Sequence, residues 1–224
     1  MTFPSQAAAV AVKDLRIEIR GRHALGTILP FAATLLIAFG LALGPGRTLL
    51  QQAAPGLLWL AVLFASILAF RRSYEAEGED GALEALTLAP MDKAAVFLGK
   101  AFAVVVELLV LEAIILVLVV ALFGLSLGGG VSVVALAFLL GTIGLAAIGS
   151  LFGVLAESPR AREAIFPLLV LPLATPVVVA GVKATALATT GLASQAGSWL
   201  GLLVAFDVVF VAAGTIVFEY LLED

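Results

Sequence analysis

The sequence predicts an all-α integral membrane protein with six transmembrane helices, an N-terminal interfacial helix and a short cytoplasmic helix. Composition is the first reason: 62% of the 224 residues are hydrophobic and 12% are charged, whereas about a quarter of residues are charged in a soluble domain. The second reason is that the apolar residues form six long runs. The third is that one long polar stretch, residues 71–100, interrupts them. We therefore expect a single transmembrane domain over residues 1–224.

The N-terminal segment, residues 7–21, has the pattern of an amphipathic helix. Its apolar face would carry Ala8, Ala11, Val12, Leu15 and Ile19. Another face would carry Lys13, Arg16 and Arg20. This arrangement is typical of a helix that lies in the headgroup region of a membrane. The alternative is a solvated charged helix that leads into the first membrane span.

Six apolar runs follow the N-terminal segment. They cover residues 23–43, 55–70, 94–123, 131–156, 164–182 and 199–218. Most approach or exceed the ~20 residues that a helix needs to cross a bilayer. The second run is short, and we expect Gln51, Gln52 and the alanines before Pro55 to extend it. An outer loop rich in small residues is expected at 183–198.

The basic residues predict the orientation of these spans. With the N-terminus inside, ten of the twelve basic residues are cytoplasmic, and only Arg47 and Lys183 lie outside. The ten are Lys13, Arg16, Arg20, Arg22, Arg71, Arg72, Lys93, Lys100, Arg160 and Arg162. Because cytoplasmic loops carry the excess of Lys and Arg, the asymmetry predicts an inside N-terminus. Six spans then return the C-terminus to the cytoplasm.

The polar interruption predicts a cytoplasmic loop at residues 71–93. Five carboxylates lie between Glu75 and Glu84, which excludes the segment from the bilayer core. Asp80 can cap a short helix in which Leu83 and Leu86 share a face, and Pro90 ends it. Such a helix has the form of a docking element. Asp92 is placed to cap the third span.

Three acidic residues fall inside predicted spans, where ionisable groups are functional candidates. Glu107 and Glu112 lie in the third span and Asp207 in the sixth. Five residues separate the two glutamates by about 140° around a helix, so they do not form a paired-carboxylate site. For Glu107 and Glu112, a translocation path or partner contact competes with a purely structural role. We favour a structural role for Asp207, which we expect nearer a membrane surface.

Several kinds of chemistry lack their residues in this sequence. There is no cysteine and one histidine, His23, so we expect no metal or haem site built within the chain and no bound cofactor. The phosphate-binding pattern G-x-x-x-x-G-K-[ST] is absent, as are nucleophile-elbow and zinc-protease motifs. We therefore expect a non-catalytic protein with no nucleic-acid partner. Any ATP that drives it would bind another chain.

Short motifs in order along residues 13–181 resemble the haem exporter protein B family, CcmB. They are Leu43-Gly44-Pro45, Ala54-Pro55-Gly56-Leu57-Leu58-Trp59, Asp80-Gly81-Ala82-Leu83-Glu84 with Pro90, Gly99-Lys100, Leu140-Gly141-Thr142 and Leu171-Pro172-Leu173. The resemblance implies an ABC-2-like permease subunit in the bacterial inner membrane, active in cytochrome c maturation. Its implied partners are a CcmA-like ATPase that binds ATP, CcmC- and CcmD-like membrane proteins and a CcmE-like haem chaperone, with a homodimer as one candidate assembly.

The resemblance also assigns roles within the chain. The ATPase-coupling element would comprise Glu75, Glu79, Asp80, Gly81, Leu83, Glu84, Leu86 and Pro90. Two transport roles stay open: haem itself is the exported substrate, or ATP hydrolysis releases the haem-loaded chaperone. Two other functions compete with these, namely an ABC-2 permease for a lipid, polysaccharide or drug, and a passive scaffold of the maturation complex.

Overall fold

The computed structural model describes residues 2–21, 24–79, 92–155 and 159–221. These residues form helices joined by short turns, and no strand occurs among them. The long helices are α1 (Phe3–Gly21), α2 (Leu29–Leu43), α3 (Arg47–Glu79), α5 (Lys93–Phe123), α6 (Val131–Leu155), α7 (Pro159–Thr189) and α8 (Gly197–Leu221). The shorter ones are the π-helical turn η1 (Ala24–Ile28) and the 3₁₀ turns η2 (Gly128–Gly130) and η3 (Ala193–Ala196). The predicted all-α fold is confirmed.

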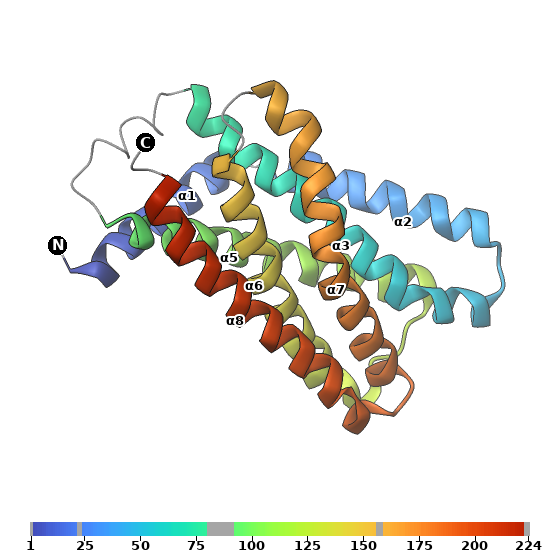
Figure 1. The fold of residues 1–224 in the computed structure, drawn as a ribbon. Coiled ribbons are helices and arrows are strands. Elements are labelled where there is room, and N and C mark those ends of the chain that lie inside the picture. Colours follow the sequence, from blue (N-terminus) through green and yellow to red (C-terminus); the bar gives the residue numbers. More distant parts are fainter. Residues whose placement is uncertain (1, 22–23, 80–91, 156–158, 222–224) are drawn as a thin grey trace.

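Six helical segments of the described chain are long and apolar enough to cross a membrane, as predicted. They are Gly26–Leu43, Arg47–Phe70, Lys93–Phe123, Gly128–Phe152, Leu168–Thr189 and Ala193–Val217. The connections α2–α3, α5–α6 and α7–α8 lie toward one end of the bundle, while α1 and the start of α5 lie toward the other (Figure 1). We call these the connection end and the α1 end.

Large apolar side chains project from the outside of the bundle. Examples are Ile37, Phe102, Val117, Leu168 and Val208, all of which are exposed. In water such a surface would be costly, because each buried CH₂ group gains about 0.8 kcal/mol. In a bilayer the same surface contacts lipid tails that are equally apolar, so it carries no penalty. The exposed surface therefore agrees with a membrane-embedded bundle.

Helix α3 is longer at both ends than the apolar run that predicted it. It begins at Arg47 and continues through Pro55, so the predicted extension through Gln51 and Gln52 is confirmed. Membrane helices tolerate proline where neighbouring groups satisfy the freed carbonyl. The apolar span ends at Phe70, as predicted, and the helix itself continues to Glu79, so residues 71–79 of the segment expected as a cytoplasmic loop are helical. The expected coupling helix, residues 80–90, lies outside the described residues.

Helix α7 also differs from its prediction. The outer loop expected at residues 183–198 is wrong in its first part, because α7 continues through Lys183 to Thr189. Residues 183–189 contain no glycine or proline that would end a helix. The connection begins after Thr189 and turns at Gly191, whose φ of +80° is readily adopted by glycine. Helix α8 then begins at Gly197.

The centre of the bundle is built around Trp59 of α3, which is fully buried. A β-carbon at Gly141 of α6 would lie 2.5 Å from the indole Cη2 atom, and one at Gly181 of α7 would also overlap the ring. The two glycines therefore make the space that the indole occupies. Its Nε1–H donates a hydrogen bond to Thr185 Oγ1 of α7 at 2.9 Å. Trp59 of α3 therefore contacts both α6 and α7. Its polar atom has a buried hydrogen-bond partner, as is usual for a buried tryptophan.

Candidate functional site

Helix α1 packs closely against the first turns of α5, next to the segment predicted to couple to a partner. Val10 and Ala11 are buried on this side of α1. A β-carbon at Gly99 of α5 would lie 2.6 Å from the carbonyl oxygen of Ala7 and 2.8 Å from Val10 Cβ. Only glycine allows this approach, because real β-carbons do not come so near another atom. The predicted helix at residues 7–21 is present and begins earlier, at Phe3.

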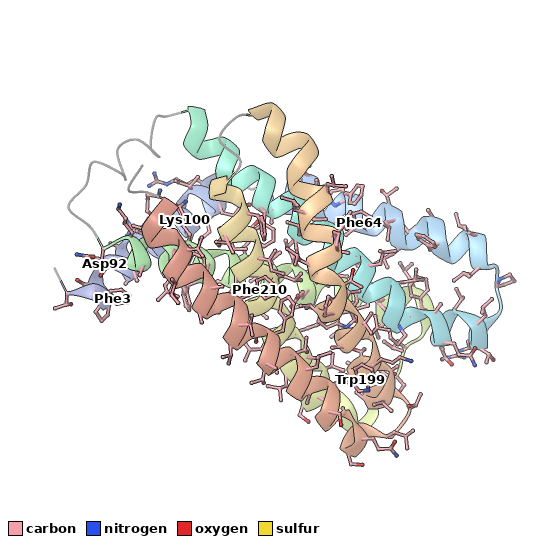
Figure 2. All side chains as sticks on the ribbon, viewed as in Figure 1. Phe3, Phe64, Asp92, Lys100, Trp199 and Phe210 are labelled. Carbon is pink, nitrogen blue, oxygen red and sulfur yellow. The ribbon has the colours of Figure 1, made fainter. Side chains whose placement is uncertain are left out.

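A buried lysine adds a charged contact to this interface. Lys100 is 4% exposed, although lysine is almost never buried without a partner. Its Nζ atom lies 3.8 Å from Oδ2 of Asp14 on α1, and Asp14 Oδ1 lies 3.0 Å from Lys13 Nζ. Figure 2 places Lys100 and Asp92 at the same α1 end of the molecule. The aspartate therefore connects a surface cation of α1 with a buried cation of α5.

Asp92 fixes the residue at which α5 begins. Its Oδ1 accepts a hydrogen bond from the backbone N–H of Ala94 at 2.9 Å, so the predicted N-cap is confirmed. Its own backbone N–H donates to Oε1 of Gln6 on α1 at 3.0 Å. The start of α5 is therefore fixed by its own N-cap and by a hydrogen bond to α1.

The predicted coupling residues divide into two groups. Glu75 and Glu79 belong to the last turns of α3. The others lie outside the described residues: Asp80, Gly81, Leu83, Glu84, Leu86 and Pro90. Their role stays a prediction.

Glu112 is a buried acid between two membrane helices. It is 1% exposed and lies on α5. The fully buried Thr142 of α6 donates a hydrogen bond from its hydroxyl group to Glu112 Oε1 at 2.7 Å. The other oxygen, Oε2, accepts no hydrogen bond from the described residues. The pair therefore fastens α5 to α6, and one carboxyl oxygen keeps unused acceptor capacity inside the bundle.

The other two acids lie apart from Glu112. Glu107 is partly exposed and near enough to Glu18 of α1 for the two carboxylates to interact. Asp207 is 8% exposed and lies near the middle of the span Ala193–Val217, which corrects our expectation that it is nearer a membrane surface. A β-carbon at Gly144 of α6 would lie 2.8 Å from Asp207 Oδ1. Neither Asp207 oxygen has a hydrogen-bond partner among the described residues.

These positions decide what the acids can do together. The described part of the chain contains no group of three His, Cys, Asp or Glu side chains that could hold a metal ion. Glu112 contacts Thr142 of α6, and the 140° separation places Glu107 on a different face of α5. A role of either glutamate in a translocation path or partner contact stays a prediction.

Comparison with known proteins identifies the family. The CcmB protein family matches residues 5–223. The chain belongs to the CcmB family. Heme exporter protein B of Pseudomonas aeruginosa is 32% identical over 210 residues, covering 90% of this chain and 92% of that protein. The Bradyrhizobium diazoefficiens protein of the same name is 32% identical and covers 92% of both chains. In Rhodobacter capsulatus, Heme exporter protein B is 30% identical over 84% of this chain and 85% of its own length.

The CcmB assignment together with the six spans makes this a multi-pass membrane protein. Sequence reasoning named Glu112 in this CcmB chain but missed its partner, Thr142. A signal was present, because a carboxyl group at membrane depth needs a polar neighbour and the fourth apolar run offers few. Its polar side chains are Ser132, Thr142 and Ser150, together with Glu157 and Ser158 just beyond its end. Among the run's three hydroxyl residues, Thr142 alone lies near the middle.

Sequence reasoning also missed the buried pair of Lys100 and Asp14. Lys100 served as evidence of orientation and as part of the Gly99-Lys100 motif, and Asp14 was not singled out. The sequence Gly99-Lys100 contained a further signal, since a glycine permits close contact of membrane helices and a neighbouring lysine then needs an acid. Which acid it meets depends on how α1 folds back onto α5. That contact is tertiary and has no local pattern.

Proposed function

We propose that this chain is the membrane permease subunit of an ABC transporter complex that exports or delivers haem for c-type cytochrome biogenesis. The observation that carries the proposal is the family match, which covers residues 5–223. Relatives in three bacteria share the name Heme exporter protein B at 30–32% identity over most of their length. The proposal makes haem the substrate and assigns no catalytic residue to this chain.

The proposed location is the bacterial inner membrane, with both termini in the cytoplasm. The ten-to-two distribution of basic residues supports this orientation. In the fold, α1 lies at the end away from the α2–α3 and α7–α8 connections (Figure 1). Arg47 begins α3 directly after the first of these connections. The connection end is therefore proposed to face the periplasm.

A separate CcmA-like subunit would bind and hydrolyse ATP, and it would dock on the segment between α3 and α5. CcmC- and CcmD-like membrane proteins and a CcmE-like haem chaperone complete the proposed assembly. Force applied to residues 80–91 would reach α5 at Asp92. Because Gln6 binds the backbone of Asp92 and Gly99 contacts α1, the start of α5 and α1 would move together. This joint motion is the proposed route from ATP hydrolysis to rearrangement of the membrane helices.

The test uses Leu83→Asp and Leu86→Asp variants of the full chain in cells that depend on it. Both leucines are predicted on the docking face, and Ala85→Asp is the matched control because position 85 would fall on a different face of the predicted helix. We expect both leucine variants to insert into the membrane, to lose co-purification with the ATPase subunit and to abolish haem-stained c-type cytochromes. The control should retain all three properties.

Two results would contradict the proposal separately. Unchanged co-purification of the leucine variants would remove the docking assignment. Normal c-type cytochromes in cells that lack the chain entirely would remove the haem assignment.

A further inference from the structure

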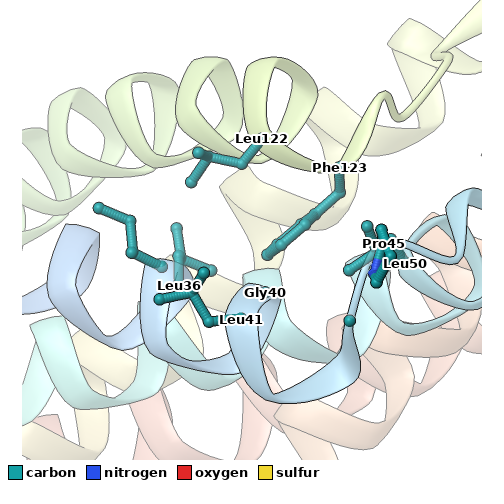
Figure 3. Close-up of a pocket in the computed structure, with 9 residues that line it drawn as sticks. Leu36, Gly40, Leu41, Pro45, Leu50, Leu122 and Phe123 are labelled. Atoms are coloured by element: carbon teal, nitrogen blue, oxygen red, sulfur yellow. The ribbon is translucent and has the colours of Figure 1, made fainter.

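An apolar groove opens at the connection end, between the end of α2, the start of α3 and the end of α5 (Figure 3). Its volume is about 370 Å³, within the ~300–1,000 Å³ range of small-molecule sites. The lining residues are Leu36, Ile37, Gly40, Leu41, Gly44, Pro45, Leu50, Leu122 and Phe123. Apart from backbone atoms, this lining offers only hydrocarbon to an occupant.

Glycine and phenylalanine create the groove together. Gly40 has no side chain, and a β-carbon there would lie 3.1 Å from Cε1 of Phe123. The Phe123 ring thus leans toward α2 and forms one wall, as Figure 3 shows. On the rim, Ile37 and Leu41 are exposed, Leu41 to 79%. The groove is therefore open toward the surroundings of the bundle, which in a membrane are lipid tails.

The depth of the groove follows from the helices that line it. The candidate spans Gly26–Leu43 and Lys93–Phe123 both end at the groove, and the span Arg47–Phe70 begins there. Residues at the ends of membrane spans lie where the hydrocarbon meets the headgroups. The groove therefore extends from the acyl chains up to the headgroup layer of one leaflet.

The cationic side chain of Arg47 lies near the end of α5 that lines the groove. A β-carbon at Gly124, the residue after Phe123, would lie 3.6 Å from Nε and from Nη2 of Arg47. Arg47 is exposed and makes no ion pair with the described residues. Its neighbour Gln51 is already engaged, since Nε2 donates to the Gly124 carbonyl oxygen at 2.8 Å. The guanidinium therefore keeps its donors for an anion from outside the chain.

We propose that this groove is a binding site for a glycerophospholipid, with one acyl chain against the apolar lining and the phosphate on Arg47. A phospholipid combines the two required chemistries, because its hydrocarbon chain and its anionic phosphate meet at the headgroup boundary. Arginine is well suited to the phosphate, since its planar donors can bind two oxygens at once. The proposal concerns this leaflet and does not depend on which substrate the bundle transports.

The test reconstitutes the full chain in nanodiscs of dioleoylphosphatidylglycerol that contain a small fraction of the same lipid with a diazirine in one acyl chain. After irradiation and proteolysis, mass spectrometry maps the labelled residues. We expect labelling to concentrate on Leu36–Pro45 and on Leu122 and Phe123. An Arg47→Gln variant should lower it several-fold there.

Matched controls separate this site from ordinary lipid contact. Lys183→Gln removes the other basic residue at the connection end and should leave the labelling unchanged, because Lys183 lies on α7, which contributes no residue to the groove. Ile37→Trp fills the mouth from an exposed position and should also reduce it. Both Arg47 and Ile37 are exposed, so these variants should keep the thermal stability of the parent protein.

Three outcomes would overturn the proposal. Labelling of the groove no stronger than that of the exposed face of α8 would mean general lipid contact. Equal labelling by a diazirine-bearing hexadecanol, which lacks a phosphate, would remove the role of Arg47. Cross-links between two copies of the chain at the groove would identify a protein occupant instead.

Discussion

The two ends of α5 are packed in opposite ways. At the α1 end, α5 is enclosed: Gly99 meets α1, and Phe97 is fully buried where Gly214 of α8 gives it room. At the connection end, Leu122 is exposed and the groove separates α5 from part of α2. The α1 end of α5, which we call its base, is therefore tightly packed. The connection end of α5, which we call its tip, is loosely covered. A displacement at the base would carry its neighbours along, while the tip leaves space for lipid.

Glycine serves different purposes at the two ends. A β-carbon at Gly99 would overlap atoms of α1, so this glycine is needed for close packing. One at Gly40 would lie 3.1 Å from the Phe123 ring, a tight contact with a side chain and not with backbone. Small residues let membrane helices approach one another. The two glycines therefore differ in what a larger side chain would displace, which is backbone of α1 at Gly99 and an aromatic ring at Gly40.

The largest expected effect is at the base. Gly99→Leu should separate α1 from α5, because the nearest atom is the backbone oxygen of Ala7, which cannot rotate away. We expect a loss of about 3 kcal/mol in unfolding free energy, the upper part of the range for overpacking. Thermal unfolding in detergent measures it. Gly56→Ala is the control, since a β-carbon there meets nothing within 4 Å. Equal melting temperatures for the two variants would show that the close contact contributes little.

Hydropathy was enough to predict the number and type of spans, because each apolar run must cross the same hydrocarbon thickness. It did not predict how far the helices α3 and α7 continue. The end of α3 at Glu79 is charged helix outside any apolar run, and residues 183–189 continue α7 through polar Lys183. Hydropathy identifies the residues that can lie in lipid. It does not identify the end of a helix, because a helix continues as long as its backbone hydrogen bonds continue.

The candidate site was predicted only in part for a related reason. Asp92 as a cap was predictable, because capping is local and depends on the residues that follow. Glu112 was recognisable as a buried acid. Its partner Thr142 is thirty residues away, and the pairing of Lys100 with Asp14 depends on α1 folding back. Such contacts depend on which helices pack together, and no local pattern in a single sequence indicates the packing partner of a helix.

A smaller effect is expected from the charged contact at the base. Lys100→Met keeps the buried length of the side chain and removes its charge, while Asp14 keeps its ion pair with Lys13 at 3.0 Å. Because Asp14 keeps one cation, the loss should be about 1–2 kcal/mol, below the ~3–5 kcal/mol for a fully orphaned buried charge. Detergent thermal unfolding again supplies the measurement. Arg16→Met, on an exposed position of α1, should change stability by less than ~0.5 kcal/mol.

A double variant sharpens this result. If Lys100 acts through Asp14, combining Lys100→Met with Asp14→Asn should cost less than the sum of the single changes. Strict additivity would mean that the 3.8 Å contact carries no energy and that other contacts hold Lys100 in place.

The smallest effect is expected at the tip, where Gln51→Ala removes the hydrogen bond from Nε2 to the Gly124 carbonyl oxygen. Gly124 ends α5 with a φ of +64°, and this bond ties that end to α3. Hydrogen bonds between membrane helices contribute about 0.6 kcal/mol on average, so the melting temperature should fall only slightly. Gln52→Ala, at the exposed neighbouring position, is the control. A loss as large as that of Gly99→Leu would mean that the tip is held as firmly as the base, and the contrast between the two ends of α5 would no longer stand.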